Sequence, residues 1–415
     1  MTTSVPERPR PAEKSGPYYS QGIIWSQKDS ILKPGNNKRA GEYRRQPSGH
    51  STFHPAPLPP EPPIELTESL QRALSRADRE LGRLDGSITT LPNPDLFVAM
   101  YVRKEAVLSS QIEGTQSSLQ DVLAAEAHLM DAQRPDDVEE VLNYIEALQH
   151  GLQRLPTLPV SVRLICEIHE KLLQGTRGGK LTPGQLRKIQ NWIGPSGSPI
   201  GEASFVPPPP QELPDLLTEL EKFLHNDQSL PVLLQIGLAH AQFETIHPFL
   251  DGNGRIGRLL IALLLSERDI LQKPVLYLSH YFKRHRQRYY DLLQNIRDAG
   301  EWEPWLEFFL TGVAEVSAEA TETARKILQL REEHRALIAE NLGYSAGNGH
   351  RILEEMFEHP ILSVNRAMKI TQTTYAAANA LIGRLEDLGL LREITGQKRN
   401  RRFRYEPYVQ LFDGG

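Results

Sequence analysis

Residues 246–258 read IHPFLDGNGRIGR, and the apolar run from Leu259 to Leu265 follows directly. Such a run is typical of a buried helix, so Gly252 to Gly254 form the turn that enters its N-terminus. Helix N-termini carry unpaired N–H groups and a partial positive charge, and glycine-flanked turns aim further N–H groups inward. The stretch therefore predicts a binding site for phosphate.

The side chains around this turn have the chemistry of a nucleotide site. Arg255 and Arg258 are three residues apart, so they share a helix face and can bind successive phosphates. Asp251 is a suitable oxygen ligand for a Mg²⁺ ion that bridges those phosphates. His247 is the side chain here whose reference pKa lies near neutrality, so it can take a proton from an attacking hydroxyl.

The pattern H-P-F-x-D-G-N-G-R-x-x-R is filled at every position by residues 247–258, and it resembles the signature of the Fic family. The resemblance implies transfer of AMP from ATP to a hydroxyl side chain of a target protein, with Mg²⁺ as cofactor. It implies that His247 is the base and that Asp251 holds the metal. It also implies that Asn253 and neighbouring amides hold the α-phosphate region, while Arg255 and Arg258 bind the β- and γ-phosphates. The nucleotide-binding residues predicted on this stretch are Gly252, Asn253, Gly254, Arg255, Ile256, Gly257 and Arg258.

A second motif lies at the end of a helix predicted from Pro94 to Glu113. The sequence Ser109-Ser110-Gln111-Ile112-Glu113-Gly114 fits S/T-x-x-x-E-G/N, which resembles the inhibitory motif that many Fic proteins carry before the catalytic core. Glu113 places a negative charge at the negative end of a helix, which costs roughly 0.3–1 kcal/mol unless a cation answers it. By the resemblance that cation is Arg258, which would then be withheld from the γ-phosphate. The alternative is an exposed glutamate at a helix end.

Composition and charge limit the remaining classes. The chain has 415 residues, 39% of them hydrophobic, which indicates two or three domains with real cores. Its net charge of −5 gives no overall attraction to nucleic acid or anionic membranes. Cys166 is the single cysteine, so an internal disulfide and a cysteine-based zinc site within one chain are excluded. The N-terminus has no apolar signal core and the run from Leu259 to Leu265 is too short to span a bilayer, so we expect a cytoplasmic protein with no membrane partner.

The predicted fold class is mainly α, with a Fic helical core, a small β-hairpin flap and a C-terminal winged helix-turn-helix domain. Amphipathic or apolar helical patterns recur along most of the chain. They cover Leu70–Leu84, Ser118–Met130, Val138–Leu152, Val160–Leu173, Gln211–His225, Pro231–Phe243, Lys283–Asp298 and Ser317–Asn341. The predicted parts are an extended or disordered arm at 1–50, a helical region with the inhibitory motif at 51–130, the catalytic core at 131–316, a connecting helix and linker at 317–349, and the winged helix at 350–415.

The flap is predicted where Gln190–Gly194 and Ala203–Val206 flank the turn-rich Pro195–Glu202. In Fic proteins a hairpin of this kind lies over the active site, and its open edge can align a target segment by strand addition. Ile193 and Phe205 are then candidate clamps. A hairpin that only shields the site is the alternative.

Three tyrosines are candidates for contact with the nucleoside. The resemblance implies that the region around the helix Lys283–Asp298 closes over the adenosine, where Tyr281, Tyr289 or Tyr290 would stack on the base or ribose. Aromatic residues at helical spacing are more often part of a core. We include Tyr290, together with Glu113, among the predicted nucleotide-site residues.

The last seventy residues form a compact pattern of helices followed by two extended runs, Leu390–Thr395 and Arg402–Tyr405. This order resembles a winged helix-turn-helix domain. The end is basic, with Arg392, Lys398, Arg399, Arg401, Arg402 and Arg404 against Glu393. Such a wing can lie on DNA phosphates, but Glu386 and Asp387 interrupt the basic surface, and many winged helices bind protein or dimerise.

The function predicted from these features is a self-inhibited protein adenylyltransferase acting on a Ser, Thr or Tyr hydroxyl. Its partners are ATP and an unknown target protein, with self-modification, a homodimer and DNA contact through the winged helix as further expectations. The alternatives are an enzyme that removes AMP, in which Glu113 positions water, and a nucleotide-sensing DNA-binding regulator. A metal-dependent hydrolase built on His240, His247 and Asp251 is a weaker alternative, because the surroundings of these residues suit phosphate.

Overall fold

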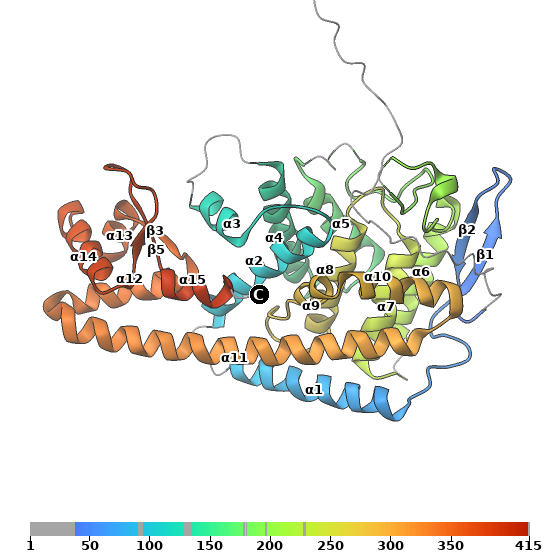
Figure 1. The fold of residues 1–415 in the computed structure, drawn as a ribbon, viewed down its shortest axis with the longest axis horizontal. Coiled ribbons are helices and arrows are strands. Elements are labelled where there is room, and N and C mark those ends of the chain that lie inside the picture. Colours follow the sequence, from blue (N-terminus) through green and yellow to red (C-terminus); the bar gives the residue numbers. More distant parts are fainter. Residues whose placement is uncertain are drawn as a thin grey trace, which may run out of the picture.

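The structure is a computed structural model that describes residues 38–89, 94–127, 135–176, 179, 181–195, 197–226 and 230–413. Helices dominate it, and its two sheets are small and antiparallel, so the mainly α class is confirmed (Figure 1). Most of the predicted arm, up to residue 37, lies outside the described residues.

Two long helices lie along one side of the molecule (Figure 1). Helix α1 (Glu68–Thr89) buries Leu70, Leu81 and Leu84, which repeat at the spacing of one helix face. It continues to Thr89, five residues beyond the predicted pattern Leu70–Leu84. Helix α11 (Trp302–Leu342) begins fifteen residues before the predicted start and joins the catalytic core to the C-terminal unit. Its first turns are anchored by Trp302 and Trp305, which are almost fully buried.

The centre of the core is α8 (Asn253–Glu267), the buried helix predicted after the phosphate-binding turn. It packs against α7 (Val232–Ile246), in which residues 233–246 are all buried. Helices α2, α4 and α5 pack around α8 as well. Helix α8 can be buried along most of its length because neighbouring helices cover its faces.

The other core helices agree with the predicted pattern within a few residues. Helix α3 begins with a capping box, since Ser118 Oγ accepts from Asp121 N and the Asp121 carboxylate accepts from Ser118 N. The predicted helix Lys283–Asp298 is two helices that meet at His285. The bounds are α2 (Pro94–Ile112), α3 (Leu119–Glu126), α4 (Asp136–Arg154), α5 (Val162–Leu173), α6 (Leu213–Asn226), α9 (Ser279–Arg284) and α10 (Arg286–Ala299).

A hairpin that the sequence did not predict occupies the end of the proposed arm. Strands β1 (Gly41–Arg45) and β2 (Ser51–Pro55) pair antiparallel. Phe53 N–H donates to the carbonyl of Val206 at 2.9 Å, which joins β2 to the flap segment. One edge of that segment is therefore covered by β2.

The predicted flap hairpin is reduced to a single antiparallel bridge between Ile193 and Phe205. The two residues exchange backbone hydrogen bonds of 2.9 and 3.1 Å. A short 3₁₀ helix (Ile200–Glu202) lies between them, and Pro207 follows. Prolines lack the N–H that a ladder needs, so the pairing cannot extend.

The C-terminal unit has the order helix, strand, two helices and hairpin. The predicted linker at 343–349 is wrong, because a 3₁₀ turn (Gly343–Ser345) leads straight into α12. The assignment of this unit to the winged-helix class stays a prediction. Its elements are α12 (Ala346–Glu358), β3 (Ile361–Ser363), α13 (Val364–Thr371), α14 (Tyr375–Asp387), β4 (Arg392–Glu393), β5 (Arg402–Arg404) and α15 (Glu406–Asp413), with sheet order β3-β5-β4.

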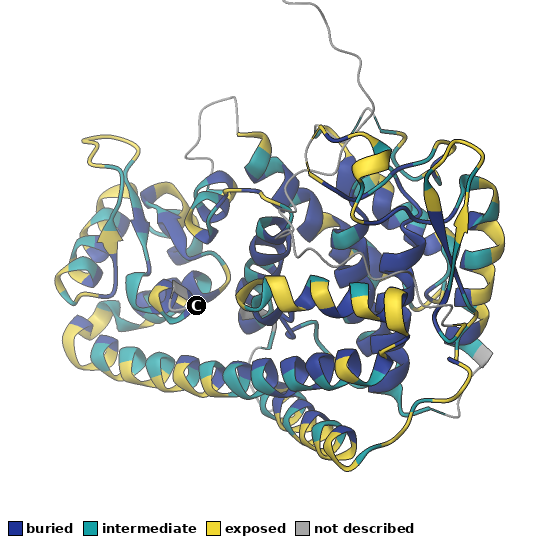
Figure 2. Cartoon of the chain, turned by 45° about the vertical axis from the view of Figure 1, so that its right-hand side comes forward, coloured by how far each residue is buried: buried dark blue, intermediate teal, exposed yellow. Residues whose placement is uncertain are grey.

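Burial follows this arrangement (Figure 2), with exposed residues on the outer faces of the long helices and at the tip between β4 and β5. Within the described ranges, every helix is either too short or too polar to cross a bilayer.

Candidate active site at the N-terminus of α8

His247 sits at the end of α7 with its imidazole in a defined tautomer. It is the C-cap of α7 and adopts the left-handed conformation, with φ 49° and ψ 60°. Its Nδ1 lies 3.4 Å from the carbonyl oxygen of Glu244. A carbonyl only accepts, so Nδ1 carries the hydrogen and Nε2 keeps the lone pair of a base. Burial lowers the pKa of His247 to about 3, helped by the charges of Arg187 and Arg297, so the ring is neutral at physiological pH.

The loop that follows is held by two asparagines. Asn253 Oδ1 accepts from Phe249 N, and Asn253 Nδ2 donates to Phe249 O, both at 2.9 Å. Asn191 Nδ2 donates to the same carbonyl at 2.8 Å. The side chain of Asn253 is thus used by the loop itself. Its predicted part in phosphate binding is left to the backbone N–H at the start of α8 and to the second hydrogen of Nδ2.

Asp251 is supported by a residue that the sequence analysis did not identify. His169 in α5 accepts at Nδ1 from Gly184 N–H at 2.9 Å, so its Nε2 carries the hydrogen and donates to Asp251 O at 3.1 Å. The ring also stacks on Phe249, with centroids 3.7 Å apart. A histidine on an otherwise apolar helix face was the available signal, but nothing in the sequence linked it to residue 251.

The Asp251 carboxylate fits a single-carboxylate Mg²⁺ site. Its Oδ1 accepts from Gly252 N–H at 2.6 Å and lies 3.5 Å from Arg255 Nη2. Within the described residues both contacts use Oδ1, which leaves Oδ2 to a cation. Mg²⁺ is held in nucleotide sites by one or two carboxylates, phosphates and waters, so one exposed carboxylate oxygen beside a phosphate site fits it. The described part of the chain has no cluster of three metal-ligating side chains.

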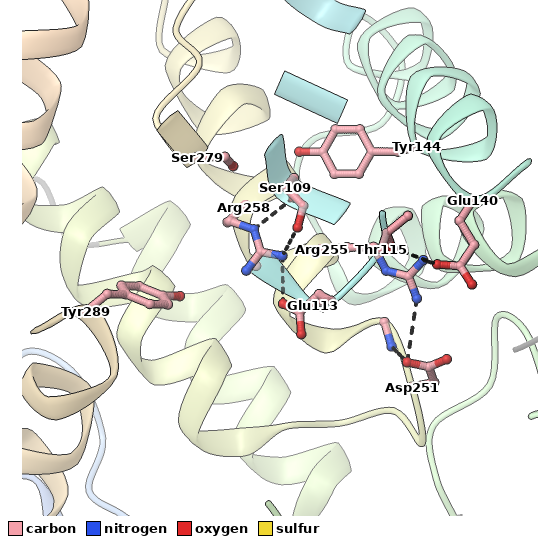
Figure 3. A network of polar contacts seen from close by, with 12 residues as sticks. Ser109, Glu113, Thr115, Glu140, Tyr144, Asp251, Arg255, Arg258, Ser279 and Tyr289 are labelled. Atoms are coloured by element: carbon pink, nitrogen blue, oxygen red, sulfur yellow. Dashed lines mark hydrogen bonds and ion pairs between the residues drawn. The ribbon is translucent and has the colours of Figure 1, made fainter. Parts of the chain in front are cut away.

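The two arginines of α8 point in different directions (Figure 3). Arg255 turns toward Asp251 and Glu140, with Nη1 3.4 Å from Glu140 Oε2. Its Nε is buried and has no hydrogen-bond partner among the described residues. The hydrogen-bonding capacity of the Arg255 guanidinium is therefore not fully used, as expected of a group that binds an anionic ligand.

Arg258 is held by the inhibitory motif (Figure 3). Its Nη2 donates to Glu113 Oε1 at 2.7 Å and to Ser109 O at 3.0 Å, and its Nε donates to Ser109 Oγ at 2.8 Å. The guanidinium is 2% exposed. Burial, the largest single influence, would lower the pKa of Arg258, but Glu113 acts together with Tyr289, Tyr290 and Glu244 to raise it. The predicted pair is thus present, and both ends of the motif, Ser109 and Glu113, hold the same arginine.

Two glycines of α8 leave space for the carboxylates of Glu113 and Glu244. A Cβ at Gly254 would lie 2.2 Å from Glu113 Oε1, and a Cβ at Gly257 would lie 2.3 Å from Glu244 Oε1. Gly252, the N-cap of α8, has φ 78°, which favours glycine. Ile256 is buried, and neither Ile256 nor Gly257 belongs to the cavity wall.

A cavity joins these groups. Its wall contains most of the predicted residues, and Arg255, Ile256 and Gly257 are not part of it. The lining residues are Glu113, Ile193, Glu244, His247, Asp251, Gly252, Asn253, Gly254, Arg258, Tyr289 and Tyr290.

The aromatic candidates divide in two. Tyr290 lines the cavity as predicted, and Ile193 reaches it from the flap segment. Tyr281 is buried against Phe308 and lies outside the cavity wall. Phe205 is also buried and stacks on Arg297, whose guanidinium lies 3.8 Å from the ring centroid, so it is not a clamp.

His240 belongs to a buried network. Its Nδ1 donates to Gly257 O and its Nε2 accepts from Tyr289 OH, both at 2.9 Å. With both nitrogens used, and with burial lowering its pKa to about 3, His240 is a packing residue. This removes the basis of the metal-dependent hydrolase alternative.

Glu244 is the second residue that sequence reasoning missed. It is almost fully buried beside the cavity, and its Oε1 has no hydrogen-bond partner among the described residues. Burial raises its pKa to about 7, opposed by Arg258 and reinforced by Glu113. Its position three residues before His247 was visible in the sequence, but its orientation toward Gly257 was not.

Two family models match the parts of the chain that contain the site residues. Residues 71–153 match the Fic/DOC family N-terminal model, and residues 159–265 match the Fic/DOC family model. The first range contains Glu113 and the second contains His247 to Arg258. The first match continues through α4, across the boundary predicted at residue 130.

Curated relatives are similar over the same part of the chain. A probable protein adenylyltransferase of Aquifex aeolicus is 33% identical over 139 residues, which are 34% of this chain and 38% of the relative. Protein adenylyltransferase Fic of Culex quinquefasciatus is 31% identical over 154 residues, which are 36% of this chain and 27% of the relative. The similarity thus spans less than two fifths of either relative.

Among solved structures, a crystal structure of a Fic family protein from Desulfovibrio desulfuricans G20 aligns with a TM-score of 0.54 at 19% identity. The alignment covers 83% of this chain and 97% of that one, which shows a shared fold. Both family regions are present in this chain, in order, and each supplies one side of the Glu113–Arg258 pair. The chain therefore contains a Fic/DOC family N-terminal region and a Fic/DOC family domain.

Proposed function

We propose that this chain is a protein adenylyltransferase that transfers AMP from Mg-ATP to a Ser, Thr or Tyr hydroxyl, and that Glu113 holds it inactive. The observation that carries the proposal is the position of His247, whose Nδ1 faces Glu244 O, in the same cavity wall as the N-terminus of α8 and Arg258. The names of the relatives as protein adenylyltransferases support the same chemistry.

The proposed reaction is an in-line displacement. The hydroxyl oxygen of the target attacks the α-phosphorus, the bond from that phosphorus to the bridging oxygen breaks, and pyrophosphate leaves. The hydroxyl proton moves to His247 Nε2. The amides at the start of α8 and the guanidinium of Arg255 stabilise the charge on the phosphates.

Asp251 is the residue that would hold Mg²⁺. A Mg²⁺ ion held there would supply positive charge that offsets the charge of the phosphates. Asp251 itself is kept in place by Gly252 N–H and by the His169 contact to its carbonyl.

Inhibition follows from competition for Arg258. The same guanidinium that would bind the γ-phosphate is engaged by Glu113 and Ser109. A nucleotide must displace a buried ion pair or bind without this contact, with its α-phosphate turned away from the attacking hydroxyl. We therefore expect Glu113→Gly to raise the rate of transfer strongly, by ten-fold or more, since one charge-assisted contact is worth about 1.5–3 kcal/mol.

The test uses ATP labelled on the α-phosphate and, in parallel, on the γ-phosphate. Native chain, Glu113→Gly and Glu113→Gly/His247→Ala are each incubated with Mg²⁺, alone and with a cell lysate as a source of targets. AMP transfer predicts protein-bound label from the α-phosphate and none from the γ-phosphate. The signal should be strong for Glu113→Gly and absent when His247 is replaced.

Other outcomes select the alternatives. If Glu113→Gly binds ATP but is as inert as the His247→Ala double variant, the transferase proposal is wrong. Removal of AMP from a modified target by the native chain, lost in Glu113→Gly, would indicate the reverse reaction. Label on the chain itself would establish self-modification, and a dilution series of the native chain tests whether a homodimer controls inhibition.

We propose DNA as a second partner, bound by the C-terminal unit. The loop between β4 and β5 exposes Lys398, Arg399 and Asn400, and Tyr375 at the start of α14 is 53% exposed. Binding to duplex DNA that weakens steeply with salt, and that weakens further in Lys398→Ala/Arg399→Ala, is the expected result. Unchanged binding in that variant, or none at low salt, would favour a protein partner.

A further inference from the structure

Arg187 is a buried arginine in the irregular segment between α5 and the flap, and its guanidinium contacts backbone carbonyls at the end of α7. Its Nε donates to His247 O at 2.9 Å, and its Nη2 lies 3.4 Å from Ile246 O. Its backbone N–H donates to Pro248 O at 2.9 Å. Carbonyls at a helix C-terminus lack partners within the helix and carry negative charge, so a guanidinium suits this place.

The same guanidinium reaches the flap. Nη2 donates to Pro208 O at 2.6 Å, just beyond the Ile193–Phe205 bridge. The planar guanidinium of Arg187 therefore links the end of α7 and the backbone of His247 to Pro208, which follows the flap bridge. The strained left-handed backbone of His247 needs such support, because a side chain in this region costs about 1 kcal/mol or more.

Arg187 has no carboxylate partner among the described residues, although it is only 2% exposed. Desolvation lowers its pKa to about 9, so it still carries its charge at neutral pH. Near His247, Arg297 donates to Thr245 Oγ1 and Glu244 O, and the carboxyl of Glu244 is buried. The base is thus enclosed by two cations whose hydrogen bonds go largely to carbonyls. Three further charged side chains line the same cavity as His247: Glu113, Asp251 and Arg258.

We propose that Arg187 is the positioning residue for His247, fixing both the direction of the imidazole and its distance from the flap. Its charge has a second effect, since it disfavours protonation of the ring and so keeps Nε2 free to accept the hydroxyl proton. The inference rests on the proposed function, because it assigns Arg187 a role in the same reaction.

Two substitutions in a Glu113→Gly background separate these effects. Arg187→Lys keeps the charge but has a single nitrogen, which cannot take the separate places of Nε at His247 O and Nη2 at Pro208 O, and Arg187→Met loses both the charge and the hydrogen bonds. We expect kcat to fall about 10- to 100-fold in each, because a misplaced base is costly. KM for ATP should change less than about three-fold, since Arg187 is not in the cavity wall.

A second measurement does not depend on activity. In the otherwise native chain labelled at the histidine ring carbons, the His247 signal is assigned by its loss in His247→Ala and followed by NMR from pH 8 to pH 5. The ring should stay neutral in the native and Lys chains and should titrate at higher pH in Arg187→Met. Arg268→Met is the matched control, because Arg268 donates to Leu224 O near the end of α6 and lies outside the site.

Several results would overturn the inference. One is a kcat within two-fold of the parent in both Arg187 variants, or a fall that Arg268→Met reproduces. Another is a His247 ring that titrates alike in Arg187→Lys and Arg187→Met. If the Glu113→Gly parent transfers no AMP, the proposed function fails by itself, and the NMR titration still decides whether Arg187 controls His247.

Discussion

At the scale of single residues, Glu244 combines burial with an unmet hydrogen bond. Its carboxyl faces Gly257, and its Oε1 has no partner among the described residues. In the unfolded chain it ionises near its reference pKa of 4.5, whereas in the folded chain its pKa is about 7. Between these values the folded state binds more protons than the unfolded state, so the native chain loses stability as pH rises through this window.

Glu244→Gln should remove this loss. The difference in unfolding free energy between the variant and the native chain should grow in favour of the variant from pH 4.5 to 7 and stay constant above. Its total is on the order of 3 kcal/mol for a shift of this size. Glu105, whose pKa burial also raises to about 7, is present in both proteins and cancels.

Denaturant titrations at several pH values measure this difference. A difference that stays flat between pH 4.5 and 8 would mean that Glu244 is hydrated or paired in solution. Because Glu113 contributes to the raised pKa of Glu244, the same titration in a Glu113→Gly background should give a smaller pH effect.

The neighbourhood of several candidate residues could be predicted, but most of their hydrogen bonds could not; the Glu113–Arg258 pair is the exception. His247, Asp251, Arg258 and Glu113 lie where the motifs place them, because spacing along one helix and one turn fixes their neighbourhood. Asn253 differs because its partner, the backbone of Phe249, is a local contact that a motif does not specify. Support that depends on distant segments, such as that from His169, needs the tertiary fold.

At the scale of elements, α2, the helix that precedes Glu113, is held by other parts of the chain. Glu105 accepts from Ser279 and Tyr144, which tie α2 to α9 and α4. The C-terminal helix α15 adds a contact, with the ring of Phe412 5.5 Å from that of Tyr101 and Phe412 O accepting from Lys104 Nζ at 3.1 Å.

Phe412→Ala should therefore loosen α2 as well as α15. Replacing a buried phenylalanine by alanine costs about 3–5 kcal/mol. Hydrogen exchange should become faster over residues 101–112, the half of α2 that contains Tyr101 and ends at the inhibitory motif.

Tyr375→Ala is the control for this experiment, since its ring is exposed in the same unit and should cost less than about 0.5 kcal/mol. Faster exchange confined to residues 406–413, with α2 unchanged in Phe412→Ala, would show that α15 does not support α2.

Helices with a clear apolar stripe were predictable, and short paired strands were not. The buried run of α8 and the capping box of α3 are local signals. The hairpin β1–β2 and the single flap bridge depend on each other through Phe53 and Val206, which are far apart in sequence. The glycines at 343–349 suggested a linker, but Gly349 packs closely on Ile338 and Leu342 and continues the fold.

At the scale of the whole molecule, the two family regions meet at the Glu113–Arg258 contact, and the C-terminal unit packs on the helix that precedes Glu113. The N-terminal region supplies Glu113, the Fic/DOC domain supplies Arg258, and α15 contacts α2 at Tyr101 and Lys104. The order of these parts was predictable from the sequence. Their packing was not, because α11 runs without a break through the boundary placed at residue 316.

The proposed inhibition through the Glu113–Arg258 pair is best tested by the rate of AMP transfer from α-labelled ATP. The chains compared are the native chain, Glu113→Gly and Glu113→Gly/Arg258→Ala. We predict a slow native rate, a rate at least ten-fold higher in Glu113→Gly, and a return to the native level or below when Arg258 is also removed. A Glu113→Gly chain no faster than the native one, or a double variant as fast as Glu113→Gly, would contradict inhibition through Arg258.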